Sequence, residues 1–170
     1  MQIKTCTQDD ISDLIKISTK SYLEHYTYLW LDNGANYIKI NFNVDKINQE
    51  ISDPNSVFFL IHDGQEFVGL IKINIDSKTE NFSAGVALEL ERIYLVKEAS
   101  GKGLGKKTID FVKDFARQKN KKIIWLKVMQ SSMVVEFYKK QGFTIVGETN
   151  LNYPGIKAEF QKMFLMHLNL

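Results

Sequence analysis

A glycine-rich turn between a strand pattern and a helix pattern restricts the fold of this chain more than any other feature. Residues 88–96 alternate apolar and charged side chains as a half-buried strand does, and the apolar side chains within 104–116 recur at helical spacing. A second β-branched run follows at 123–128. Two strands joined through a helix are typical of a parallel pair, because parallel strands need a long crossover. The segment therefore predicts a parallel crossover inside a larger sheet.

The segment before residue 54 predicts two helical regions. Thr7 supplies a capping hydroxyl ahead of two acidic residues, so we expect a first helix from this point to about Tyr26. Asn43 is placed to cap a second helix over 44–51. Pro54 disfavours helical backbone in the residue before it, which sets the end of this region near Asp53.

A β-hairpin is predicted next, because the β-rich runs 56–61 and 66–73 flank Asp63-Gly64, a strong turn signal. Residues 77–87 are polar and indicate a loop. The last predicted elements are a short helix at 132–140 ending at Gly142 and strands at 143–146 and 160–168. The expected fold class is α/β: a central mixed, mostly antiparallel sheet with one parallel crossover and helices on both faces.

Length and composition are those of one globular domain, so we expect residues 1–170 to form a single domain. The 44% hydrophobic and 25% charged content argues against disorder and coiled coil. Cys6 is the one cysteine, which excludes an internal disulfide. The sequence shows neither a stretch of 18 apolar residues nor a secretion signal at its start, so we expect a cytoplasmic protein without a membrane partner.

Charge is distributed unevenly along the chain. Residues 1–64 carry a net charge of −4 and residues 97–122 a net charge of +6. Anions should therefore prefer the second segment. A solvated helix face explains the same basic residues, and so does a nucleic-acid surface near Trp125, which would show steeply salt-dependent binding.

The turn at 100–107 has the position of a phosphate cradle, since it precedes a helix whose first N–H groups are free to bind an anion. It lacks the spacing of a nucleoside triphosphate loop, because Ser100 stands where the first glycine belongs and Lys107 follows Gly105-Lys106. It also lacks the dinucleotide fingerprint, since its three glycines are evenly spaced. Both common phosphate motifs are therefore excluded.

The segment 91–107 resembles the coenzyme A signature of the GCN5-related N-acetyltransferase (GNAT) family, in which Gly103 and Gly105 match the two small positions of [Gln/Arg]-x-x-Gly-x-[Gly/Ala]. The segment 128–143, which contains Tyr138 and ends in Gly-Phe, is similar to the second signature of that family. Ser100 and Ser131 depart from the usual glutamine or arginine and the usual asparagine.

This resemblance implies an acetyl-CoA-dependent N-acetyltransferase that moves an acetyl group to a primary amine by direct attack on the thioester. It implies a role for Tyr138 as general acid toward the leaving thiolate, with aromatic packing as the alternative. It also implies that the strand end 93–95 holds the pantetheine arm and that the turn cradles the pyrophosphate. The residues implied to bind the coenzyme are Ile93, Tyr94, Leu95, Gly101, Lys102, Gly103, Leu104, Gly105, Lys106, Ser131 and Tyr138.

A base or a low-dielectric site must also supply the free amine, because an alkylammonium with a pKa near 10.4 is deprotonated to only about a few parts in ten thousand at neutral pH. Glu91 and Glu89 are the candidates, since residues two apart on a strand share a face. We favour Glu91 for its proximity to Ile93. The alternative is that both carboxylates attract a cationic substrate or face solvent.

The acceptor is expected to be a small polyamine-like amine or a protein amine, because Glu-Arg-Ile-Tyr before the glycine turn resembles the bacterial polyamine acetyltransferase branch most. In the family the acceptor pocket includes the end of the first helix, where core packing is the alternative role for the aromatic side chains. Those residues are Tyr22, His25, Tyr26, Tyr28 and Trp30.

The sequence leaves other functions and partners open. A non-catalytic module that binds acyl-CoA is the main alternative, because Ser100 and Ser131 leave room for lost activity. The histidines at 25, 62 and 167 show no metal-ligand spacing, so we expect no metal. We expect no nucleic-acid partner, and the sequence leaves a homodimer open.

Overall fold

The computed structural model describes all 170 residues, which fall into two compact units. The first unit holds Met1–Ile73 and Arg92–Gly105, and the second holds Asn74–Glu91 and Lys106–Leu170. Three elements pass from one unit into the other: strands β3 (Glu66–Asn74) and β4 (Ala87–Leu95) and helix α4 (Leu104–Gln118).

Seven strands form one sheet in the order β1-β2-β3-β4-β5-β7-β6. The other strands are β1 (Gln2–Thr5), β2 (Ser56–Asp63), β5 (Ile123–Met129), β6 (Thr144–Asn150) and β7 (Lys162–Asn169). β4 and β5 are parallel, whereas β1 with β2, β5 with β7 and β6 with β7 are antiparallel. Helices flank the sheet, so the predicted mixed α/β class with one parallel crossover is confirmed.

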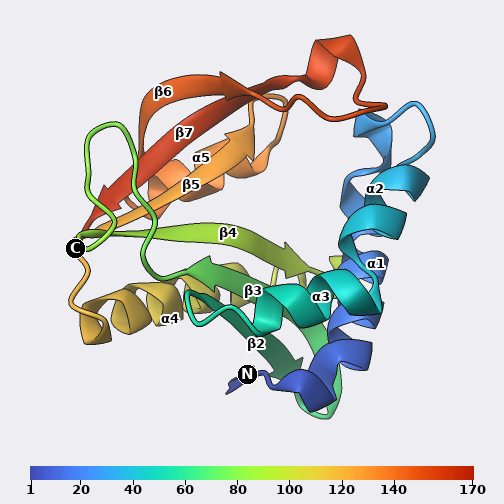
Figure 1. Cartoon of the computed structure of the whole chain (residues 1–170), viewed down its shortest axis with the longest axis horizontal. Coiled ribbons are helices and arrows are strands. Elements are labelled where there is room, and N and C mark those ends of the chain that lie inside the picture. Colours follow the sequence, from blue (N-terminus) through green and yellow to red (C-terminus); the bar gives the residue numbers. More distant parts are fainter. The chain divides into compact units, whose positions relative to one another are not determined.

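The first unit contains helices α1 (Ile11–His25), α2 (Ala35–Asn41) and α3 (Val44–Ile51) (Figure 1). The predicted cap of α3 is confirmed, because the side chain of Asn43 accepts a hydrogen bond from the N–H of Lys46 at 2.9 Å. Helix α2 was not predicted. It follows Gly34, whose φ of +86° turns the chain into a short helix that lacks a fully buried face.

The predicted hairpin of the first unit is also confirmed. β2 and β3 are joined across Asp63-Gly64, where Gly64 takes a φ of +65° that suits glycine. β1 pairs with β2 from Gln2↔His62 to Thr5↔Phe59. The unit buries large apolar side chains from these elements, among them Leu14, Ile47, Phe58, Leu60 and Leu70.

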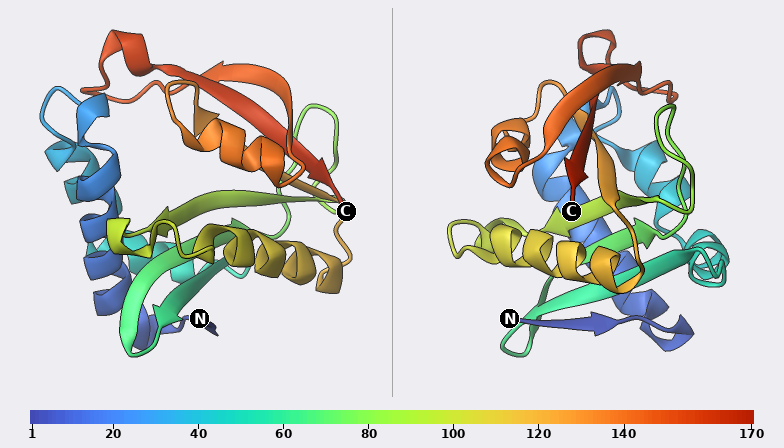
Figure 2. Two further views of the ribbon diagram at one scale, coloured as in Figure 1. Left: turned by 180° about the vertical axis from the view of Figure 1, so that it is seen from behind. Right: turned by 90° about the vertical axis from the view of Figure 1, so that its left-hand side faces the viewer.

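The second unit is built on β5, β7 and β6, which lie side by side with helix α5 (Val134–Lys140) next to β5 (Figures 1 and 2). β7 pairs with β5 over its whole length, and a register shift between Ile145 and Gly147 bends β6. Gly142 ends α5 with a φ of +96°, as predicted. β6 runs four residues beyond its predicted end at 146.

One face of this part of the sheet carries charged and aromatic side chains. Directly paired residues point to the same side of a sheet, so the pairs Glu89↔Trp125 and Trp125↔His167 place these three side chains on one face. Lys127, two residues beyond Trp125, shares it. Two hydrogen bonds hold the loop before β4 against β5 and the residues just before it. Trp125 Nε1 donates to the Ser77 carbonyl at 3.0 Å, and the buried Lys121 ammonium donates to Asp76.

None of the helices is both long and apolar enough to cross a membrane.

Candidate active site

The glycine turn exposes its backbone directly before α4. Gly101 and Gly103 have φ angles of +75° and +72°, which side chains rarely adopt, and a Cβ atom at either position would meet nothing within 4 Å. Both glycines are exposed, and α4 runs for 15 residues from Leu104. The helix therefore directs free N–H groups and the positive end of its dipole toward an accessible turn, as an anion site requires.

Two lysines at this turn, Lys102 and Lys106, form ion pairs of different lengths. Lys102 is exposed and lies 3.6 Å from the Asp63 carboxylate, so it is only loosely paired. Lys106 donates to Asp110 at 2.8 Å, and this hydrogen bond lowers the pKa of the Asp110 carboxyl. Exposed surface pairs of this kind contribute little to stability. Gly105 is half-buried and Leu104 is buried, so the accessible backbone of the turn is that of Gly101, Lys102 and Gly103.

The end of β4 predicted to bind pantetheine is packed among aromatic rings of the first unit. The Tyr94 ring lies 5.9 Å from Tyr22, 5.6 Å from Tyr26 and 6.1 Å from Phe42 between centroids, and burial raises the pKa of its hydroxyl well above the usual range. The ring nitrogen Nε2 of His25 donates to the Leu95 carbonyl oxygen at 3.0 Å. The strand end is thus held in place by its side chains.

Two of the predicted acceptor residues belong to the core. Tyr22 and Trp30 are buried, the Trp30 Nε1–H donates to the Tyr22 hydroxyl at 2.9 Å, and Tyr22 stacks on Tyr37 at 4.6 Å. Tyr26 is half-buried, and burial raises its pKa to about 12. Tyr28 is exposed at the surface. The packing role considered for this aromatic group therefore holds for Tyr22 and Trp30.

The two candidate bases form one hydrogen-bonded cluster in the second unit. Asn74 Nδ2, at the end of β3, donates to Glu91 Oε2 at 2.8 Å and to Glu89 Oε2 at 3.0 Å. The Ser77 hydroxyl donates to the same Glu89 oxygen at 3.1 Å, and the Lys127 ammonium lies 3.7 Å from Glu89 Oε1. The carboxylates are therefore organised by neighbouring polar groups and do not simply face solvent.

Tyr138 and Ser131 lie on either side of the start of α5. Tyr138 is 7% exposed, and its ring contacts Phe143 at 5.5 Å between centroids. Ser131 is exposed in the short segment between β5 and α5. Tyr138 thus packs in the core of the second unit.

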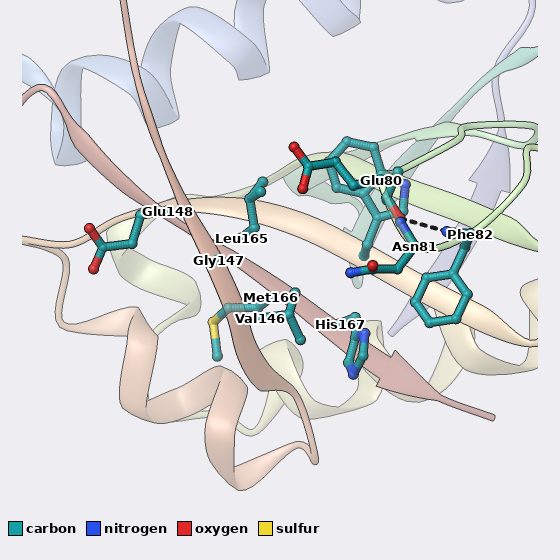
Figure 3. Close-up of a pocket in the computed structure, with 11 residues that line it drawn as sticks. Glu80, Asn81, Phe82, Val146, Gly147, Glu148, Leu165, Met166 and His167 are labelled. Atoms are coloured by element: carbon teal, nitrogen blue, oxygen red, sulfur yellow. Dashed lines mark hydrogen bonds between the residues drawn. The ribbon is translucent and has the colours of Figure 1, made fainter.

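A cavity of about 240 Å³ is lined by Trp125 and His167, which share a sheet face with Glu89. Figure 3 shows the residues that line it. Its lining includes Trp125, Leu165 and the rings of Phe82 and His167, which lie 5.6 Å apart between centroids. The carboxylates of Glu80 and Glu148 are also part of the lining. Lys127 reaches over the Trp125 ring at 5.1 Å, so this side chain links the cavity with the carboxylate cluster.

Comparison with known proteins places this architecture in a family. The family model described as Acetyltransferase (GNAT) family matches residues 13–143. An uncharacterized N-acetyltransferase of Lactobacillus delbrueckii subsp. lactis is 28% identical over an alignment of 153 residues, which covers 87% of each chain.

Solved structures share the fold over the full chain. A PaiA N-acetyltransferase from Thermoplasma acidophilum, determined in complex with coenzyme A, superposes with a TM-score of 0.76 at 20% identity and covers 100% of both chains. A spermidine N-acetyltransferase from Vibrio cholerae superposes with a TM-score of 0.71 at 18% identity, covering 99% of this chain and 92% of the other.

The chain belongs to the GNAT family of acetyltransferases, and it is an enzyme of that class. The resemblance in its two signatures is thereby confirmed at the level of the family. The acetyl donor of the family, acetyl-CoA, fits the turn described above, because Gly101 and Gly103 leave space for a phosphate to approach the backbone.

The sequence did not predict the contacts of two residues near the candidate bases, Asn74 and Arg92. Asn74 carries no local signal, because a single asparagine at a strand end is common and its contacts depend on the neighbouring strand. Arg92 lies next to Glu91, but its partner Glu50 is far away in the chain. The alternation of charged and apolar residues in β4 was the one available signal, since it puts Arg92 on the face opposite to Glu91.

Proposed function

We propose that this chain catalyses transfer of the acetyl group from acetyl-CoA to a primary amine, either a small polyamine-like molecule or a protein amine. The observation that carries the proposal is the open glycine turn at the start of α4, with its two left-handed glycines and surrounding lysines. The 170 residues would act as one catalytic domain, because the match to the family over residues 13–143 includes residues of both units.

The coenzyme would bind through backbone groups. The N–H groups from Gly101 to Lys106 would hold the pyrophosphate at the helix start, where the dipole favours an anion. The backbone of Ile93, Tyr94 and Leu95 would pair with the pantetheine arm, and one N–H there would polarise the thioester oxygen. Removal of such a donor typically costs about 10²- to 10³-fold in rate.

In the reaction the amine nitrogen attacks the thioester carbonyl carbon, the carbon–sulfur bond breaks, and the products are an acetamide and coenzyme A. Glu91 would accept the proton that the ammonium group must lose, directly or through a water molecule. The Tyr138 hydroxyl would donate a proton to the leaving sulfur and regain one from solvent. Ser131 would contribute a polar contact to the coenzyme at the start of α5.

A cationic acceptor is favoured by the charges on the Glu89 face of the sheet. Glu89 and Glu91 lie there, and Glu80 and Glu148 line the adjoining cavity. Aromatic rings and carboxylates together suit an ammonium group on an apolar chain. The spermidine N-acetyltransferase from Vibrio cholerae shares the fold at 18% identity, so the proposed acceptor class rests on the charges of this face.

An amine panel tests this function. The purified chain would be incubated with acetyl-CoA and spermidine, lysine, an aminoglycoside or a peptide with a free N-terminus, and released thiol and acetylated product would be measured. We expect thiol release that depends on at least one amine. Heat of acetyl-CoA binding without such release would identify a non-catalytic binding module, and no heat at millimolar ligand would exclude the coenzyme site.

A further inference from the structure

Asn74 bridges the two carboxylates with a single nitrogen. A side-chain amide carries two N–H donors, and Asn74 directs them to Glu91 Oε2 at 2.8 Å and Glu89 Oε2 at 3.0 Å. Hydrogen bonds to an ionised acceptor are stronger than neutral ones. Two carboxylates on one strand face repel each other, so a shared donor is needed to hold both in fixed orientations.

Glu89 is held by further groups. The Ser77 hydroxyl donates to its Oε2 at 3.1 Å, and the Lys127 ammonium lies 3.7 Å from its Oε1. Both oxygens of Glu89 are therefore engaged, and its side chain is only 13% exposed. Its charge is balanced within the cluster before any substrate arrives.

Glu91 is placed differently in the same strand. The parallel pairing of β4 with β5 runs from Ala87↔Ile123 to Glu89↔Trp125, and Glu91 lies beyond it. It is also two residues before Ile93, on the same strand face. Of the two carboxylates, Glu91 is thus the one at the end of β4 where the thioester is proposed to bind.

We propose that Asn74 is a positioning residue for acetyl transfer, which holds the Glu91 carboxylate in the orientation that accepts the proton of the amine. Ser77 and Lys127 keep Glu89 in a supporting role, so Glu91 alone acts as the base. Asn74 itself forms and breaks no covalent bond. This inference rests on the proposed function, because it assigns roles within that reaction.

The test compares Asn74→Ala, Glu91→Gln and the double variant in steady-state assays with the most active amine of the panel. General base catalysis typically contributes about 10²- to 10⁴-fold, and loss of orientation should remove part of it, so we expect kcat of Asn74→Ala to fall about tenfold or more at pH 7. The double variant should be within about twofold of Glu91→Gln, since Asn74 acts through Glu91.

The pH dependence separates positioning from a purely structural role. The deficit of Asn74→Ala should shrink as pH rises toward about 10, where the free amine no longer needs a base. The KM for acetyl-CoA should change less than twofold. Asn48→Ala is the matched control, because it makes the same change at an exposed position of α3 outside the carboxylate cluster, and its kcat should stay within about twofold of wild type.

Each remaining outcome decides against a different claim. A wild-type chain that acetylates amines, with Asn74→Ala and the isosteric Asn74→Asp both equally active, overturns the role of Asn74 and leaves the proposed function intact. Additive losses in the double variant, or a deficit that is constant with pH, assign Asn74 a structural role. A wild-type chain without turnover on any amine removes the proposed function and this inference together.

Discussion

Arg92 donates two hydrogen bonds to Glu50, from Nη1 to Oε2 at 2.9 Å and from Nη2 to Oε1 at 3.0 Å. Both residues are buried, and the Lys72 ammonium lies 3.1 Å from Glu50 Oε1. The pairs connect α3 to β3 and β4 within the first unit. Arg92 lies between Glu91, the proposed base, and Ile93, which belongs to the strand end proposed to bind pantetheine. This buried ion cluster therefore anchors the part of β4 that carries both residues.

Replacement of Glu50 should destabilise the protein strongly. Glu50→Ala leaves the cations of Arg92 and Lys72 buried without their carboxylate, and breaking such a pair costs about 3–5 kcal/mol. The free energy of unfolding from urea titration measures the loss. Gln49→Ala, exposed on the same helix, is the control and should change it by less than about 0.5 kcal/mol. Equal effects of the two substitutions would contradict the importance of the cluster.

The Glu50 cluster also predicts how the free energy of unfolding changes at acidic pH. Burial alone would raise the pKa of the Glu50 carboxyl, but the charges of Arg92 and Lys72 outweigh it, so the pKa lies below its usual value. A lowered pKa stabilises the fold above the unfolded-state value of about 4.3 and loses this contribution as pH falls through the folded-state value. The stability difference between wild type and Glu50→Gln should therefore shrink below about pH 4. A stability difference between the two proteins that stays constant down to the pH of acid unfolding would contradict the lowered pKa of Glu50.

Gly103 should be required for coenzyme binding beyond its effect on stability. Gly103→Ala forces a side chain into a φ of +72° and adds a methyl group where the anion is proposed to approach the backbone. Gly64→Ala is the matched control, because Gly64 has a φ of +65° and equally open surroundings in the β2–β3 turn. Both should lose about 1 kcal/mol of stability. Calorimetry should show weaker acetyl-CoA binding for Gly103→Ala alone, and equal affinities would remove the turn from the site.

Tyr138 should affect the chemical step more than binding. Tyr138→Phe keeps the ring that packs against Phe143 and removes the hydroxyl proposed to protonate the leaving sulfur. We expect kcat to fall by about 10²-fold, while the KM for acetyl-CoA changes little. Steady-state kinetics with thermal unfolding as a check on folding measure this. A variant with wild-type kcat would leave Tyr138 with its packing role only.

Local patterns were sufficient for most of the elements. The Asn43 cap, the Asp63-Gly64 turn and the left-handed Gly142 were all predicted correctly, because caps and turns depend on residues within a few positions of one another. The crossover from β4 to β5 followed from strand, helix and strand in sequence. Helix α2 and the full length of β6 were missed, since each depends on neighbours elsewhere in the chain.

The sequence by itself determined the fold class, the glycine turn before α4 and the pair Glu89 and Glu91 on one strand face, because periodicity and backbone preferences are local properties. Only the tertiary structure decided which partners these groups have. Asn74 donates to both carboxylates, Arg92 donates to Glu50, and Trp30 donates to Tyr22 in the core. Hydrogen bonds and ion pairs between distant residues exist only once the chain has brought the strands and helices together, and no local pattern records them.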